Sequence, residues 1–259
     1  MKLHSKVASF IVLAGASLSA AAAPLNVFDG WNLLSNDDGV YANDFVDPGW
    51  GGQAFDAEYL FYKVEGSSLS IGLQTGFNIQ ANGGYQHSDG RKYYAGDLGL
   101  SFDGDNSTYE YAVDFGNKAR GYNTNAAISA GAGDTDAAGL YSVTTWNNDI
   151  HFGQSAPYAM DAGSLVVAAT GSNFQEGSGT LAGQLSYYNI FTFDLGNIAG
   201  LGDVLGLDAH WTMSCGNDEI DGRATDVQIT KVAEPSGLLL LGLGLLGLAA
   251  TRRRVKANS

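Results

Sequence analysis

The chain has 259 residues, of which 13 are lysine or arginine and 27 are aspartate or glutamate, so its formal net charge is −14. This charge excludes nucleic acid as a partner, because neutralising phosphates requires a basic patch. A hydrophobic content of 45% excludes a disordered chain, and the 36 glycines favour turn-rich β structure, since a glycine inside a helix costs about 1 kcal/mol relative to alanine.

The first residues have the pattern of a secretory signal peptide. Lys2 and Lys6 precede an apolar run, and small residues follow it. This order of basic start, short apolar stretch and small residues is typical of export signals. The sequence predicts cleavage after Ala22, with Ala20 and Ala22 as the small residues, so residues 1–22 form the signal peptide.

The body, residues 23–232, consists of short segments in which apolar and polar residues alternate or apolar residues gather. Alternation with a period of two is typical of half-buried strands, and Gly, Asn, Asp and Ser clusters between the segments indicate turns. We expect an all-β antiparallel sandwich, of the jelly-roll or carbohydrate-binding-module type. Residues 118–138 lack periodicity and predict a long surface loop. The expected strands are 55–64, 69–73, 98–102, 109–115, 140–146, 165–169, 181–195, 205–215 and 227–229.

Cys215 is the single cysteine, so no disulfide can form within the chain. In the segment 205–215 the alternation places Cys215 on the same face as Trp211 and Met213, while Asp208 and its polar neighbours at every second position fall on the other face. The sequence therefore predicts that Cys215 and Trp211 point into the core.

Three acidic side chains have a spacing that is similar to an EF-hand loop. Asp103, Asp105 and Asp114 stand at positions one, three and twelve. Thr108 occupies the sixth position, where an EF-hand needs glycine, which favours a plain β-turn. Calcium is thus the only cofactor that the sequence suggests. Acidic residues in 37–47 and 217–221 are expected to form solvated loops.

Candidate ligand-binding residues are few. Trp31, Trp50 and Trp146 lie in or near predicted loops and are weighed as platforms for sugar rings, with packing in the core or at its rim as the alternative; Trp50 and Trp146 are the two chosen as candidate carbohydrate residues. The body has no GxSxG elbow, P-loop or CxxC motif. We therefore expect no enzyme, although abundant carboxylates leave a secreted glycoside hydrolase as an alternative.

The last segment, residues 233–259, has three parts in a fixed order. Glu234, Pro235 and Ser236 precede the apolar stretch 237–250, and Arg252, Arg253 and Arg254 follow it. Fourteen helical residues span about 21 Å, less than the roughly 30 Å of a hydrocarbon core. The arginines should stay cytoplasmic, which leaves the body on the outer side of the inner membrane. The sequence thus predicts a short transmembrane helix with an exported domain before it.

This tail resembles the PEP-CTERM sorting signal, although Ala233 stands where that signal has its first proline. The segments 55–78, 93–115 and 210–220, the last with its Cys-Gly-Asn-Asp run, are similar to the XDD group of exosortase-dependent surface proteins, and more weakly to family 9 carbohydrate-binding sandwiches. The resemblance implies an exosortase as processing partner and a transient stay in the inner membrane. It further implies a location at the cell surface or in the exopolysaccharide matrix of a Gram-negative bacterium. The expected role is structural or adhesive; the alternatives are a carbohydrate-binding module and a glycoside hydrolase.

Overall fold

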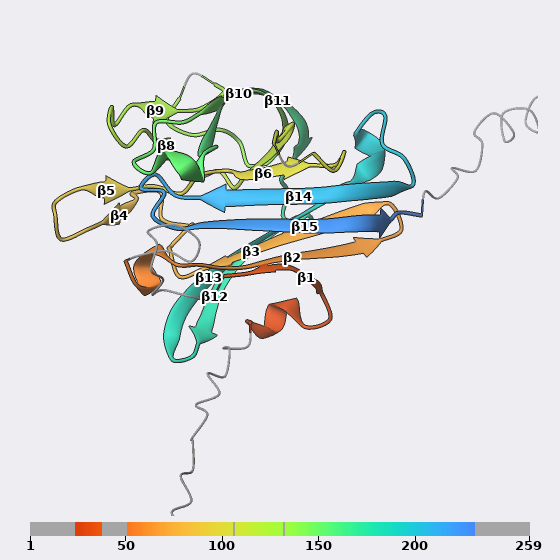
Figure 1. Ribbon diagram of the computed structural model, residues 1–259, viewed down its shortest axis with the longest axis horizontal. Helices are drawn as coiled ribbons and strands as arrows, with labels where there is room; N and C mark the ends of the chain where they lie inside the picture. Colours follow the sequence, from red (N-terminus) through yellow and green to blue (C-terminus); the bar gives the residue numbers. More distant parts are fainter. Residues whose placement is uncertain (1–23, 38–50, 106, 132, 231–259) are drawn as a thin grey trace, which may run out of the picture.

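The computed structural model describes residues 24–37, 51–105, 107–131 and 133–230, which form two antiparallel sheets and two short hairpins (Figure 1). The first sheet has five strands in the order β1 (Asn32–Asn36), β2 (Ala57–Glu65), β3 (Ser68–Thr75), β13 (Gln184–Asp194) and β12 (Phe174–Leu181). The second has six in the order β11 (Ala159–Ala168), β10 (Gly139–Asn147), β7 (Tyr111–Asp114), β6 (Leu98–Ser101), β14 (Val204–Thr212) and β15 (Glu219–Gln228). The hairpins are β4 (Tyr85–Gln86) with β5 (Lys92–Tyr93), and β8 (Ala119–Arg120) with β9 (Ala127–Ile128). Helical structure in these residues is limited to four 3-10 turns: η1 (Asn26–Phe28), η2 (Gln53–Phe55), η3 (Gly153–Ser155) and η4 (Leu195–Asn197).

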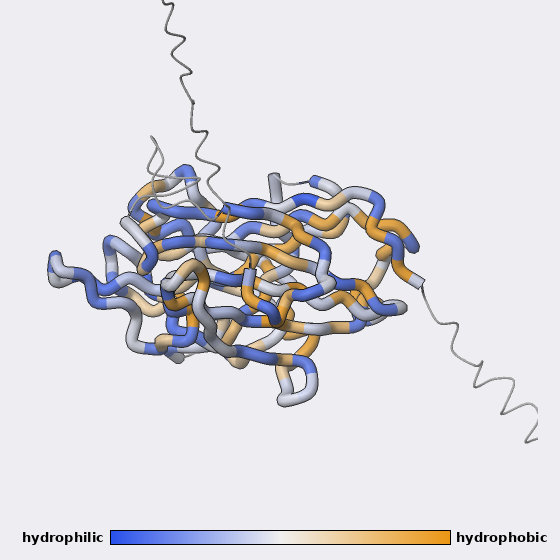
Figure 2. Tube along the Cα trace, turned by 90° about the horizontal axis from the view of Figure 1, so that it is seen from below, coloured by the Kyte–Doolittle hydropathy of each residue, from blue (hydrophilic) through white to orange (hydrophobic). Residues whose placement is uncertain are grey.

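The two sheets enclose one large hydrophobic core. Leu60, Ile71 and Phe191 from the first sheet are fully buried in the same cluster as Leu100 and Trp211 from the second. Figure 2 shows hydrophobic stretches gathered in the body of the molecule, whereas the outlying β4–β5 hairpin is mostly hydrophilic. The expected all-β sandwich is thus confirmed at the level of two packed antiparallel sheets.

Most predicted strands coincide with observed ones, and the differences have local causes. The predicted segment 181–195 is divided by a tight turn, because Ala182 and Gly183 both have positive φ angles. Leu181 therefore ends β12, a strand that the alternation did not reveal because glycines occupy two of its half-buried positions, Gly177 and Gly179. The loop prediction for residues 118–138 is wrong in part, since this segment contains the β8–β9 hairpin.

The outer faces of both sheets are also partly covered, which the half-buried strand pattern did not predict. On the five-stranded sheet, Phe28 of η1 stacks on Phe61 with ring centroids 4.3 Å apart. On the six-stranded sheet, Tyr141 and Met160 form a separate buried cluster with Ala112. Burial on both faces explains how polar side chains of central strands come to lie in the interior.

Cys215 and Trp211 are both buried, as the sequence predicted. Trp211 has no exposed surface and donates its indole N–H to the carbonyl oxygen of Gly96 at 3.0 Å. Cys215 is 5% exposed, and burial raises the pKa of its thiol to about 12. The inward direction of Trp211 is therefore confirmed, whereas β14 ends at Thr212 and Cys215 is buried in the turn that follows rather than on the strand.

The predicted signal peptide (1–22) and sorting segment (233–259) lie outside the described residues, as does Trp50. This includes all six predicted sorting-signal residues: Glu234, Pro235, Ser236, Arg252, Arg253 and Arg254. Within the described ranges, no helix has the length and apolar character needed to cross a membrane.

Candidate functional site

The outward face of β14 carries a row of polar side chains that pair with β15. The register of the two antiparallel strands places Asp208 opposite Arg223, His210 opposite Asp221 and Thr212 opposite Glu219. Side chains at such directly opposed positions lie close enough to interact. Arg223 Nε accordingly donates to Asp208 at 2.5 Å, and Thr212 Oγ1 donates to the carbonyl of Asp218 at 2.7 Å.

The turn from β14 to β15 has a conformation that depends on its Cys-Gly-Asn-Asp run. Gly216 has a φ of +62°, and a Cβ there would lie 2.8 Å from the carbonyl oxygen of Phe152. Asp218 is 1% exposed and accepts a hydrogen bond from the backbone N–H of Ala57 at 2.7 Å, which ties the turn to the other sheet. The prediction of a solvated acidic loop at 217–221 is therefore wrong for Asp218.

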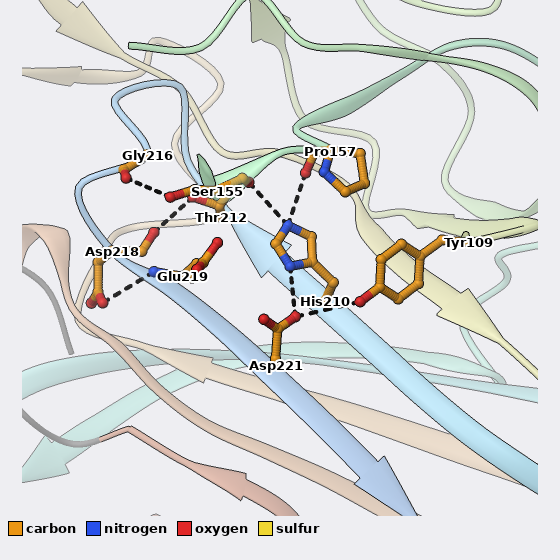
Figure 3. Close-up of polar contacts among 9 residues, drawn as sticks. All are labelled: Tyr109, Ser155, Pro157, His210, Thr212, Gly216, Asp218, Glu219 and Asp221. Atoms are coloured by element: carbon orange, nitrogen blue, oxygen red, sulfur yellow. Dashed lines mark hydrogen bonds and ion pairs between the residues drawn. The ribbon is translucent and has the colours of Figure 1, made fainter. Parts of the chain in front are cut away.

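His210 is held at both ring nitrogens (Figure 3). Nε2 lies 2.9 Å from the carbonyl oxygen of Pro157 and 3.1 Å from that of Ser155. Because carbonyl oxygens only accept, Nε2 must carry a hydrogen. Nδ1 lies 2.7 Å from Oδ1 of Asp221. The ring is thus clamped between the 155–157 loop on one side and a carboxylate on the other.

The pKa of His210 follows from these contacts. Burial lowers its pKa, but the hydrogen bond to Asp221 and the negative charges of Asp221 and Glu219 outweigh burial, so the pKa lies above its ordinary value. The Asp221 side chain is 60% exposed, whereas that of His210 is 4% exposed. The imidazole therefore lies at the inner end of a polar cluster that opens to solvent through Asp221.

A hydrogen bond holds the 155–157 loop to the β14–β15 turn. Ser155 is fully buried and its hydroxyl donates to the carbonyl of Gly216 at 2.7 Å. The peptide bond between Ala156 and Pro157 is cis. His210, Ser155 and the β14–β15 turn thus form one connected polar network.

Tyr109 connects this network to a surface groove. Its ring packs on His210 with centroids 5.5 Å apart, and its hydroxyl donates to Oδ1 of Asp221 at 3.4 Å. Burial, followed by the charges of Asp221 and Asp208, raises the pKa of the Tyr109 hydroxyl. Tyr109 and Pro157 also line a groove of about 560 Å³, called here the Trp146 groove. The lining residues are Ser107, Thr108, Tyr109, Glu110, Val143, Thr144, Trp146, Asn148, Ala156 and Pro157.

Trp146 is half-buried in the wall of this groove and its position is fixed. Its indole N–H donates to the carbonyl oxygen of Tyr109 at 2.8 Å, across 37 residues of sequence. Exposed hydroxyl and amide groups from Thr108, Thr144 and Asn148 surround the two rings. The groove therefore combines aromatic surface with hydrogen-bonding groups, the usual composition of a small-ligand site.

The structure does not bring the three candidate calcium ligands together. Asp103 and Asp105 lie in one turn after β6, where Oδ1 of Asp103 accepts from the backbone N–H of Asp105 at 2.8 Å. Asp114 ends β7, whose register pairs Val113 with Leu98 at the start of β6. The chain turns back between Asp105 and Asp114. Asp114 therefore lies at the other end of the β6–β7 hairpin, beside Asp97.

A second concave region is smaller and mostly aromatic. It encloses about 270 Å³ and is lined in part by Phe55, Tyr93, Tyr122 and His151. Tyr122 stacks on His151 with centroids 4.6 Å apart. His87 and Asn217 also line it, so it too combines rings with polar groups, in about half the volume of the Trp146 groove.

Sequence reasoning identified Trp146 but not its neighbours. The alternation placed His210 on the polar face of β14, yet its link to Asp221 depends on the register of β15, and its link to Pro157 depends on a distant loop. Period-two spacing of Glu219 and Asp221 on one strand face was the available signal. No protein-family model, curated protein or solved structure matches the chain.

Proposed function

We propose that this chain is an exported, non-catalytic adhesion protein of the cell surface or exopolysaccharide matrix, which binds polysaccharide in the Trp146 groove. The observation that carries this proposal is a half-buried tryptophan, fixed by its own N–H, beside Tyr109 and among exposed hydroxyl and amide groups. The sandwich frame supports the finer reading of a carbohydrate-binding-module-like domain.

The chemistry of the groove suits a sugar chain. A pyranose ring has one face of C–H groups, which packs favourably on an aromatic ring, and a rim of hydroxyls, which need hydrogen-bond partners. Trp146 and Tyr109 supply aromatic surface, while Thr108, Glu110 and Asn148 supply donors and acceptors. Because the groove is open, it can accept an internal segment of a long polymer.

Replacing Trp146 with alanine is expected to weaken polysaccharide binding at least about tenfold, which corresponds to about 1.4 kcal/mol. Trp146→Phe should bind with intermediate strength, because it keeps a ring but loses the N–H that fixes it to Tyr109. The measurement is affinity electrophoresis of the full chain through gels containing the host polysaccharide.

Trp31→Ala is the matched control for this experiment. Trp31 is also half-buried, but it packs edge-on against Phe28 on the five-stranded sheet. Its removal should leave retardation in the gel unchanged. Equal retardation of wild type and Trp146→Ala would contradict the groove as the binding site, and release of new reducing ends would favour a hydrolase.

The proposed export rests on the tail, and the intact mass of the mature protein tests it. If an exosortase processes the 233–259 segment, the surface form should lack the residues from Gly237 onward, including the Arg252–Arg254 triplet. Replacing Pro235 should leave a longer precursor in the inner membrane. Recovery of the arginine triplet in the surface form would contradict processing.

A further inference from the structure

The polar cluster beside the Trp146 groove has the composition of a metal site. One ligand atom each from His210, Glu219 and Asp221 lies within 4.8 Å of the other two. The three residues share one face of the β14–β15 ladder, since His210 opposes Asp221 and Glu219 is two residues before Asp221. A rigid pair of strands therefore positions all three side chains.

The orientation of the imidazole is an independent observation that points to a cation. Nε2 donates its hydrogen to the carbonyl oxygens of Pro157 and Ser155, both outside the cluster. Metal-ligating histidines characteristically donate one ring N–H to a backbone carbonyl or carboxylate, which directs the other nitrogen at the metal. Here that other nitrogen is Nδ1, 2.7 Å from Oδ1 of Asp221. Because a carboxylate oxygen only accepts, Nδ1 carries a hydrogen in the absence of metal, and a bound ion would displace that hydrogen.

We propose that His210 Nδ1, Glu219 and Asp221 bind one divalent transition-metal ion of the Zn²⁺ type. An imidazole nitrogen with two carboxylates suits Zn²⁺ and its neighbours, whereas Ca²⁺ and Mg²⁺ take oxygen ligands. Two carboxylates that face the same ring repel each other, and a divalent ion relieves that repulsion. Three protein ligands leave a coordination position open toward solvent, on the side of the exposed Asp221. This site goes beyond the proposed binding of polysaccharide.

Titration of Zn²⁺ into the untagged, chelator-treated full chain tests the proposal. The expected result is saturable binding of one equivalent, weakened at least tenfold in both Asp221→Asn and Glu219→Gln. These substitutions keep the shape of each side chain and lie at partly exposed positions, so they avoid the folding risk of replacing the buried His210. Asp226→Asn, at an exposed position on the same strand, is the control with the same change in charge and should bind as wild type does.

Nitrogen-detected NMR of the histidine ring adds a direct readout. On Zn²⁺ addition, the Nδ1 resonance of His210 should shift to the metal-bound range while the Nε2 hydrogen remains. Absence of saturable binding, or equal affinity in wild type and both carboxylate variants, would overturn the proposal. Binding at another site, such as the His151 region, would give the second of these outcomes. Because the readout is metal binding itself, the result does not depend on whether polysaccharide binds.

Discussion

Replacing Asp114 with asparagine is expected to raise the free energy of unfolding at pH 8, by up to about 4 kcal/mol. Burial, together with the charge of Asp136, raises the pKa of Asp114 from 3.8 to about 7, even though the N–H of Gly116 donates to it. Each tenfold change in proton affinity corresponds to about 1.4 kcal/mol, so the shift from 3.8 to about 7 sets an upper bound on what the ionised carboxylate costs the folded state. Asparagine keeps the acceptor oxygen without the charge.

The same group sets the direction of the pH dependence. A carboxyl whose pKa is higher in the folded than in the unfolded state contributes its full stability below about pH 4 and loses it as the pH rises through about 7. Asp97 acts in the same direction, because burial and then the charge of Asp114 raise its pKa as well. The wild type should therefore lose stability between pH 4 and 7, and Asp114→Asn should lose less.

Urea unfolding at several pH values measures this effect. Asp161→Asn, an exposed carboxylate on β11, is the control and should follow the wild-type curve. If Asp114→Asn is less stable than wild type at pH 8, or shows the same slope with pH, the assignment of a buried, uncompensated carboxylate at this position is wrong.

Replacing Trp211 with alanine is expected to lower the free energy of unfolding by about 3–5 kcal/mol. The indole has no exposed surface, packs near Phe77 and satisfies the carbonyl of Gly96, so its removal leaves both a cavity and a buried acceptor without its donor. The midpoint urea concentration should fall, while the slope of the unfolding free energy against urea concentration should stay the same. The half-buried Trp31→Ala should cost clearly less. A loss under about 1 kcal/mol for Trp211→Ala would contradict its place in the central core.

Local alternation was enough to predict one side of β14 but not the other. Trp211 is inward because side chains alternate along a strand, and this follows from sequence alone. Cys215 is also buried, but it lies in the turn after β14. His210 and Thr212 were expected on a half-exposed face, yet they are buried. Their burial depends on the 155–157 loop and on β15, which approach only in the folded chain.

Spacing along the chain was misleading for Asp114 and only partly informative for Trp146. Asp103 and Asp114 have the separation of a calcium loop, but a hairpin between them carries one to each end of two paired strands. Trp146 was a candidate because of the polar residues that follow it. Its partner Tyr109, 37 residues earlier, becomes its neighbour only through the pairing of β7 and β10.

Hydrogen–deuterium exchange in the presence of the host polysaccharide is the most direct test of the proposed adhesive function. Binding in the Trp146 groove should slow exchange of backbone amides in residues 107–110 and 143–148, which line it. Exchange in residues 25–27 and 178–180, which line a groove of about 460 Å³ at the edge of the other sheet, should stay unchanged. Protection confined to that second region, or no protection anywhere at saturating polysaccharide, would contradict the account.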